Sequence, residues 1–332
     1  MKKFALLLIV VVAVTLSGCS HGTPLTSNTS QLQKVTVLLD WFPNTNHTGL
    51  YVARDKGYFR DLGLDVTLLQ PEEGSSSQLV ATGKADFAVS SQEGVTQARA
   101  EDIPVVSIAA LIQHNTSAFA SLESAGIKTV KDFEGRRYGG WGSPIEEAVL
   151  TAVMRDAGAD YSKVKNITIG TTDFFSTIGR ESDFQWIFYG WDGVEAERRG
   201  TKLNLIFLTD LNPVLDYYTP VLITSEQHIK NKRDLVQRFV TATSQGYRFA
   251  IENPDAAADI LIRAAPELNA DLVRKSQAWL SPRYQAEASR WGEQKAEIWE
   301  GYAKWLSERK LINTMIDVNA AFTNEFLPSR AQ

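Results

Sequence analysis

The sequence contains very few residues that could form covalent cross-links or bind metals. One cysteine, Cys19, and four histidines occur in 332 residues. A disulfide bond within the chain is therefore impossible. The histidines show no metal-ligand spacing, and a second cysteine is missing, so a zinc cluster is excluded. A Gly-x-Ser-x-Gly elbow is also absent, and nothing in the sequence indicates a serine hydrolase. The four histidines are His21, His47, His114 and His228.

An excess of basic residues is missing as well, since the formal net charge is -5. Nucleic acids and anionic membrane surfaces select for clustered Lys and Arg, so we expect neither as a partner. After residue 14 no apolar run approaches the roughly twenty residues that a spanning helix needs. The content of 44% hydrophobic and 22% charged residues is that of a globular protein. A body of about three hundred residues predicts two lobes.

The N-terminus has the features of an export signal. Two lysines precede an apolar run over residues 4–14, which is too short to span a bilayer and predicts a signal peptide over residues 1–18. The run ends in Leu-Ser-Gly-Cys, which resembles the lipobox of bacterial lipoproteins and predicts lipidation of Cys19. The alternative is an ordinary signal peptide with a chance cysteine. Residues 19–34 are polar and predict a flexible tether, so we expect a lipid-anchored protein at the extracytoplasmic face of the cell membrane.

Short β-rich runs alternate with helical patterns along the body of the chain. This alternation predicts an α/β fold with helices covering mostly parallel sheets. A C-terminal apolar stripe with spacings of four and three predicts a long helix packed on one face. Expected strands cover about 35–39, 64–69, 86–89, 105–111, 166–169, 183–189, 203–208 and 217–224. Expected helices cover about 49–56, 76–82, 93–100, 146–157, the stripe at 235–249, two segments beginning near 254 and 269, and 292–309.

Ligands of open parallel sheets bind at the carboxyl ends of the strands, where helix N-termini and loop amides converge. Four segments follow predicted strands in this way, at 40–47, 90–94, 139–147 and 188–195. The first combines two aromatic residues, a proline, two carboxamides and His47, which suits a flat polar ligand. The alternative is a turn whose Asn and Asp cap the next helix.

The other three segments each allow a structural alternative. Ser91 can cap a helix whether or not a ligand binds there. Glycines before Gly142 and Ser143 let the backbone approach a ligand closely, although no Walker lysine is present. Trp191 and Glu195 are four residues apart and can lie on one helical face. A buried carboxylate there would suit an aminopyrimidine edge, and the alternative is a solvated helix start.

Several runs carry a family resemblance. The run 39–53, with Gly-Tyr-Phe at 57–59 and Gly-Lys-Ala-Asp at 83–86, resembles the thiamine-pyrimidine-precursor-binding proteins of bacterial transporters. Trp-Phe-Pro-Asn-Thr-Asn-His at 41–47 and Tyr-Gly-Trp-x-Gly-x-Glu at 189–195 narrow it to the formylaminopyrimidine-binding branch of thiamine salvage. The broader superfamily also includes nitrate-, sulfonate- and taurine-binding proteins. The likeness covers essentially the whole mature chain.

This resemblance implies a type II periplasmic-binding-protein fold, with a mixed sheet in each of two lobes. Residues 35–115 and 220–332 would form one lobe and residues 116–219 the other, closing on a ligand about crossing strands near 112–117 and 218–221. It further implies that Trp41 and Tyr189 stack on the ligand ring. The remaining predicted site residues are Asn44, His47 and Glu195 as polar contacts, Gly142 and Ser143 as hydrogen-bonding groups, and Ser91 and Trp191.

The implied ligand is N-formyl-4-amino-5-aminomethyl-2-methylpyrimidine, delivered to ABC permease and ATPase subunits by a monomer without cofactor or metal. One alternative is another small solute such as a sulfonate, which would favour Arg or Lys in the pocket, and the four segments contain none. A second is a pyrimidine-processing enzyme. The related eukaryotic synthase uses a lysine-bound pyridoxal phosphate and a cysteine-rich iron motif. Here the matching position looks like Ser90, and no cysteine follows Cys19, so we expect no enzyme.

Overall fold

The computed structural model describes residues 31–70, 75–170 and 172–329. The predicted signal peptide, Cys19 and most of the predicted tether lie outside the described residues. Helices and strands alternate along the described chain, and the strands form two separate five-stranded sheets. The predicted α/β class is therefore confirmed.

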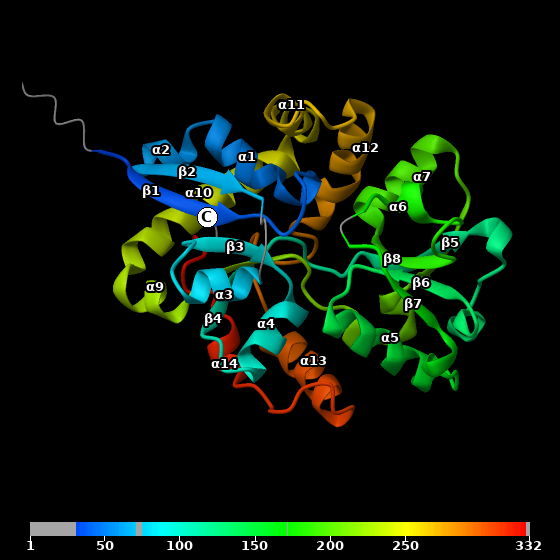
Figure 1. Ribbon diagram of the computed structural model, residues 1–332. Coiled ribbons are helices and arrows are strands. Elements are labelled where there is room, and N and C mark those ends of the chain that lie inside the picture. The colour runs from blue at the N-terminus through cyan, green and yellow to red at the C-terminus, as the bar shows by residue number, and fades with distance from the viewer. Residues whose placement is uncertain (1–30, 71–74, 171, 330–332) are drawn as a thin grey trace, which may run out of the picture. The chain divides into compact units, whose positions relative to one another are not determined.

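Figure 1 shows strands of both sheets. Each sheet is mixed, with two parallel and two antiparallel pairings, so the expectation of mostly parallel sheets is wrong. The first has the strand order β2-β1-β3-β10-β4, and the second has the order β7-β6-β8-β5-β9. In the first sheet β10 is antiparallel to both neighbours, and β5 is antiparallel to both neighbours in the second. The strands are β1 (Gln33–Leu38), β2 (Leu64–Leu69), β3 (Phe87–Ser90), β4 (Val105–Ala110), β5 (Ser117–Leu122), β6 (Arg137–Gly140), β7 (Lys165–Thr168), β8 (Phe184–Phe188), β9 (Leu203–Phe207) and β10 (Val221–Ser225).

The sequence pattern does not predict β5 or β6. Strand β5 is rich in small residues, and β6 is a four-residue strand that ends in two glycines, so both have weak intrinsic β-propensity. Pairing with neighbours on both sides overrides that preference. Strand β5 pairs with β8 and β9, and β6 pairs with β7 and β8.

The expected helices are present, although the one expected over 292–309 begins at Ala296. The described α-helices are α1 (Thr48–Asp55), α2 (Tyr58–Asp61), α3 (Ser76–Ala81), α4 (Gln92–Ala100), α5 (Pro144–Asp156), α6 (Phe174–Thr177), α7 (Val194–Arg199), α8 (Leu208–Leu211), α9 (Glu226–Asn231), α10 (Arg233–Glu252), α11 (Pro254–Ala264), α12 (Ala270–Leu280), α13 (Ala296–Glu308) and α14 (Val318–Ala321). They include short helices that the sequence pattern does not predict, among them α2, α6, α8, α9 and α14.

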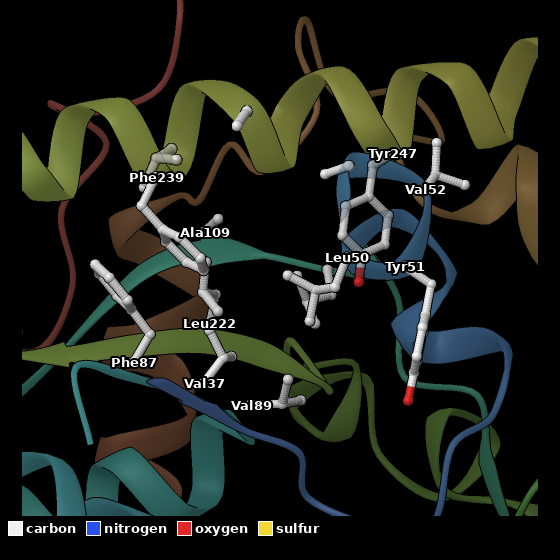
Figure 2. Close-up of a cluster of buried hydrophobic side chains, with 14 of the residues drawn as sticks. Val37, Leu50, Tyr51, Val52, Phe87, Val89, Ala109, Leu222, Phe239 and Tyr247 are labelled. Carbon is white, nitrogen blue, oxygen red and sulfur yellow. The ribbon is translucent and has the colours of Figure 1, made fainter. Parts of the chain in front are cut away.

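The predicted apolar stripe forms the inner face of α10. Phe239 is fully buried and stacks on Phe87 of β3 at 3.8 Å between ring centroids (Figure 2). Farther along the helix, Gly246 lies against Gly49 of α1 so closely that a Cβ atom on Gly246 would come within 2.0 Å of the Gly49 carbonyl oxygen. The absence of side chains at both positions lets α10 press directly on α1. This contact fixes the helix that follows the first predicted ligand segment.

Two connecting segments lie side by side where the chain passes between the sheets. One joins β4 to β5, and the other leads into β10. Asn115 donates two hydrogen bonds across these segments. Its backbone N–H donates to the Asp216 carboxylate at 2.9 Å, and its side-chain amide donates to the Leu215 carbonyl at 2.9 Å. His114 also binds Asp216, at 2.7 Å. These bonds join the first predicted crossing segment to the residues just before the second, and the hinge motion of the two segments stays a prediction.

Helix α13 contributes to the cores of both sheets. Trp299 and Ala303 pack in a cluster with residues of β3, β4 and β10. Tyr302, Trp305 and Leu306 pack instead with residues of the second sheet. The predicted assignment of residues 220–332 to a single lobe is therefore not reflected in the packing of this helix, and the exact lobe boundaries stay a prediction.

Candidate functional site

The first segment folds into a loop that is held by its own polar side chains. Asn44 caps a 3-10 turn, η1 (Thr45–His47), by accepting a hydrogen bond from the Asn46 N–H at 2.8 Å. The Asn44 N–H donates to Nδ1 of His47 at 3.3 Å, and Nε2 of His47 lies 2.7 Å from the Asp40 carboxylate. Since His47 is fully buried and both ring nitrogens have protein partners, it holds the loop in shape. The capping alternative is thus present, and ligand contact by Asn44 and His47 stays a prediction.

Trp41 occupies the more open part of the same loop. Its ring is partly exposed and meets the edge of Phe42 at 6.2 Å between centroids and 87° between planes. Phe42 itself is 53% exposed. No other ring stacks on Trp41 within the described ranges. Its position is compatible with the predicted stacking on a flat ligand.

Ser91 caps α4, as the sequence allows. Its hydroxyl accepts a hydrogen bond from the Gly94 N–H at 3.1 Å. The neighbouring Glu93 is buried and accepts a hydrogen bond from the Tyr217 hydroxyl at 3.3 Å. Burial raises the pKa of Glu93 to about 7, because no cation compensates the lost hydration of its carboxylate.

In the third segment a glutamate, Glu146, organises the loop. Its carboxylate accepts hydrogen bonds from the N–H groups of Trp141 at 3.3 Å and Gly142 at 3.2 Å, and from the Tyr138 hydroxyl. The Gly142 N–H is therefore already bound to a protein group. Ser143 precedes α5 and makes no side-chain capping bond. The predicted ligand bonds from Gly142 and Ser143 stay predictions, with the Ser143 hydroxyl the freer of the two groups.

The fourth segment forms a π-helical turn, η5 (Tyr189–Gly193), followed by α7. Trp191 of this turn packs against the core of the first sheet. Glu195 of α7 is buried and binds two guanidinium groups, with its oxygens 2.6 Å and 2.8 Å from Arg198 and 2.5 Å from Arg199. Burial alone would raise the Glu195 pKa, but these bonds outweigh it and lower the pKa. Glu195 is thus an ion-paired carboxylate, and its contact with a ligand stays a prediction.

A different carboxyl group in the same turn has no such partner. Asp192 forms no ion pair within the described ranges, and burial together with the nearby Asp173 raises its pKa to about 7. Near neutral pH this group therefore exchanges between an acceptor-only carboxylate and a carboxylic acid that can donate. Asp192 is not among the site residues predicted from the sequence.

Helix α12 brings the first and fourth segments together. The Ser276 hydroxyl donates to the Gly190 carbonyl of the π-helical turn and lies 2.5 Å from the Thr45 hydroxyl of η1. Tyr284, just beyond the helix, donates to the Thr45 carbonyl at 2.5 Å. A Cβ atom on Gly190 would lie 3.0 Å from a Leu280 methyl carbon. Two loops that are about 145 residues apart therefore share one structural support.

No residue of α12 is among the predicted site residues, although the helix carries one signal in its sequence. Ser276 and Gln277 stand on the same buried face as Leu272, Val273 and Leu280. Polar residues on a buried helix face need hydrogen-bonding partners from elsewhere in the fold. Their presence in an otherwise apolar stripe could have marked this helix as a support for the loops.

The end of α12 adds two further side chains beside Tyr189. Trp279 lies 5.2 Å from Tyr189 between ring centroids, at an interplanar angle of 43°. Arg283, in the turn η7 (Ser281–Arg283), places its guanidinium carbon 3.6 Å from the centroid of the Trp279 ring. The Tyr189 hydroxyl donates to Glu197, and burial with this bond raises the Tyr189 pKa to about 12. The four predicted segments contain no Arg or Lys, but Arg283 lies beside the fourth segment through its contact with Trp279.

Residues 31–70, 75–170 and 172–329 contain no group of three or more His, Cys, Asp or Glu side chains that could hold a metal ion. Among the described helices, none combines the length and the apolar character that crossing a bilayer requires.

The chain is similar in sequence to several known proteins. A formylaminopyrimidine-binding protein of Halalkalibacterium halodurans is 29% identical over 335 residues, covering 98% of this chain and 99% of that protein. A 4-amino-5-hydroxymethyl-2-methylpyrimidine phosphate synthase of Legionella pneumophila is 26% identical over 303 residues, covering 89% of this chain and 92% of that protein. The family therefore has relatives named as binding proteins and as enzymes.

A solved structure confirms the predicted fold. The alkanesulfonate-binding protein SsuA of Xanthomonas axonopodis pv. citri, bound to MOPS, superposes with a TM-score of 0.68 at 13% identity, covering 89% of this chain and 99% of that chain. The periplasmic-binding-protein fold is thus shared at low sequence identity. The family model described as NMT1/THI5 like matches residues 44–257, and this chain belongs to the NMT1/THI5-like family.

Proposed function

We propose that this chain is the solute-binding lipoprotein of an ABC importer and captures N-formyl-4-amino-5-aminomethyl-2-methylpyrimidine for thiamine salvage. The observation that carries the proposal is the support of two aromatic loops by one helix. Ser276 of α12 joins the loop of Trp41, through Thr45, to the turn of Tyr189, through Gly190. Aromatic side chains held on a common support suit a flat heteroaromatic ligand.

The relative from Halalkalibacterium halodurans supports the same choice of ligand, because the likeness extends over nearly the full length of both chains. An enzyme is less well supported. The related eukaryotic pyrimidine synthase uses a lysine-bound pyridoxal phosphate. The position that looks equivalent to that lysine here is Ser90, at the end of β3. A hydroxyl cannot form the imine that holds this cofactor. We therefore infer that the chain binds the pyrimidine and does not convert it.

The predicted side chains divide into two kinds in this proposal. Trp41 and Tyr189 would provide ring contacts, and Ser91, Gly142, Ser143 and Trp191 would line the site. Asn44, His47 and Glu195 would act within hydrogen-bonded groups that already hold their loops. Glu195 would keep its bonds to Arg198 and Arg199 and accept from the ligand at Oε2, which accepts only one of the three arginine hydrogen bonds.

A sulfonate is the second candidate ligand. Arg283 favours it, because a guanidinium close to the fourth segment could bind an anionic oxygen. The lack of Arg and Lys in the four segments therefore does not argue against an anionic ligand as strongly as the sequence suggests.

Calorimetric titration of the purified protein with the formylated pyrimidine, the free aminomethyl pyrimidine and an alkyl sulfonate tests the proposal. We expect the formylated pyrimidine to bind most tightly. Trp41→Ala should weaken its binding about tenfold to a hundredfold, the loss of one ring-stacking contact. Phe42→Ala is the matched control in the same loop and should change affinity less than threefold. Binding of the sulfonate alone would overturn the proposal, and unchanged affinity in Trp41→Ala would overturn the stacking role.

The proposed site of action rests on Cys19, whose thioether-linked lipid would hold the body beside the permease. Two or more acyl chains anchor a protein firmly, whereas one chain binds only marginally. Cys19→Ser should therefore release the protein from the membrane fraction into the surrounding fluid. Tight membrane association of this variant in cell fractionation would contradict the anchor and leave the ligand proposal intact.

A further inference from the structure

Arg283 differs from the other partly buried arginines of the described chain. Its guanidinium carbon stands over the Trp279 ring at 3.6 Å, and Nη1 donates to the Trp279 carbonyl at 2.5 Å. The structure gives Nε and Nη2 no hydrogen-bond acceptor within the described ranges. The side chain is therefore held in one orientation, with part of its planar donor edge unused.

Pairing with carboxylates makes the contrast clear. Across residues 31–70, 75–170 and 172–329, every other arginine that is not exposed lies within 4.0 Å of a carboxylate oxygen. Arg283 has no such partner, and burial lowers its pKa. Partial burial of a guanidinium without a compensating carboxylate is unfavourable, and a ligand acceptor would offset this cost. The paired arginines are Arg99, Arg137, Arg198, Arg238, Arg290 and Arg309.

Arg309 provides an internal comparison for this feature. The pentapeptides 279–283 and 305–309 read Trp-Leu-Ser-Pro-Arg and Trp-Leu-Ser-Glu-Arg. In both, the guanidinium stands over the tryptophan four residues earlier, at 4.5 Å for Arg309. Arg309 also binds Asp156 at 2.6 Å. The same local arrangement therefore has a carboxylate in one place and none in the other.

The position of Arg283 connects it to the proposed ligand site. Trp279, on which the guanidinium lies, contacts Tyr189 of the fourth segment, and the charge of Arg283 acts on the Tyr189 hydroxyl. The Arg283 carbonyl accepts a hydrogen bond from Gln113 in the first crossing segment at 3.2 Å. The residue is thus fixed beside the turn that the proposed function assigns to ring contact.

We propose that Arg283 is a specificity-determining residue that donates hydrogen bonds to an oxygen on a substituent of the bound ring. The proposal rests on the proposed function for the ring itself. A formamide carbonyl and an anionic sulfonate oxygen share the acceptor chemistry that a guanidinium edge recognises. A free ammonium group on the same substituent would instead be repelled by Arg283 and left without an acceptor.

The test compares the affinities of the whole protein for three probes. These are the formylated pyrimidine, the free aminomethyl pyrimidine and an alkyl sulfonate. The wild type should bind the formylated pyrimidine at least tenfold more tightly than the free aminomethyl pyrimidine. Arg283→Met should reduce this ratio to below threefold, mainly by weakening the formylated ligand. Arg283→Lys, which keeps the charge and loses the planar fork, should give an intermediate ratio. Arg309→Met is the matched control and should leave the ratio unchanged.

The outcomes separate this inference from the proposed function. Preferential binding of an alkyl sulfonate by the wild type, lost in Arg283→Met, would overturn the pyrimidine proposal and support the acceptor role of Arg283. An unchanged ratio in Arg283→Met would overturn the role of Arg283 while the pyrimidine proposal stands. A wild type that binds none of the three probes would overturn both. Near-ultraviolet circular dichroism would establish that each variant is folded, and Arg283→Gln replaces Arg283→Met if the latter is not.

Discussion

The ends of α12 and α13 carry nearly the same five residues in different surroundings. Arg283 and Arg309 both lie over a tryptophan four residues earlier, and both donate Nη1 to that tryptophan's carbonyl, at 2.5 Å and 3.5 Å. Arg309 then meets Asp156 of α5, which is 153 residues away in the chain. Arg283 instead faces Tyr189 without a carboxylate. Local sequence therefore determines the stacked arrangement, and the neighbouring element determines whether the charge is compensated.

Two buried glutamates show the same contrast between a charge that has an oppositely charged partner and one that has none. Glu195 binds Arg198 and Arg199, and its pKa is lowered despite burial. Glu93 has a tyrosine hydroxyl as partner but no cation, and burial raises its pKa to about 7. Its Oε2 atom has no hydrogen-bond partner within the described ranges. Compensated charges in this protein support structure, whereas uncompensated ones cost stability and remain available for other roles.

The largest effect that tests this contrast is expected at Glu93. Burial raises the folded-state pKa of Glu93 from 4.5 to about 7, so ionisation of this carboxyl lowers the stability of the fold. The folded state binds the proton more tightly than the unfolded state, so stability falls as pH rises from about 4.5 to 7 and is constant above it. Glu93→Gln removes this loss. We expect the variant to be more stable than the wild type by about 2 kcal/mol at pH 8, and nearly equal at pH 4.

Urea unfolding of both proteins at the two pH values measures this difference. Glu195→Gln is the matched control, because it neutralises a carboxylate that does have cations, and it should destabilise the fold at pH 8. Asp192 also titrates near pH 7, but it is present in both proteins and cancels from the comparison. Equal stabilities of Glu93→Gln and wild type at pH 8 would remove the distinction between compensated and uncompensated carboxylates.

A smaller effect is expected from the two arginines in the absence of ligand. Arg309→Met breaks a partly buried ion pair and leaves Asp156 without its partner, which should cost about 1 kcal/mol. Arg283→Met removes no ion pair and keeps the apolar stem over Trp279, so its stability should stay within about 0.5 kcal/mol of the wild type. Denaturant midpoints of the two variants measure both values. A larger loss in Arg283→Met than in Arg309→Met would reverse the comparison.

Much of the secondary structure could be predicted because it depends on local patterns. The apolar stripe of α10 is buried against the first sheet, and Ser91 caps α4. Gly57 and Gly63 follow the ends of α1 and α2, and both have positive φ angles, 81° and 75°. These features depend on residues within one or two helical turns, which the sequence displays directly.

The ion pairs of Glu195 with Arg198 and Arg199 could also be predicted from the sequence. Arg198 and Arg199 follow Glu195 by three and four residues, the spacing at which side chains meet on a helix. The spacing of Glu195 to Trp191 suggests a ligand contact, whereas its spacing to the two arginines predicts the ion pairs that the structure contains. Trp191 lies in the π-helical turn and packs on the core of the first sheet.

The sequence by itself determined the α/β class, the long amphipathic helix and the two aromatic segments around Trp41 and Tyr189. These depend on periodicity, turn residues and short motifs, all of which act over a few neighbours. Only the tertiary structure decided that Ser276 would join those segments and that Arg283, unlike Arg309, would lack a carboxylate. Such pairings depend on which distant elements come within a few ångströms, and two nearly identical pentapeptides contain no information about that distance.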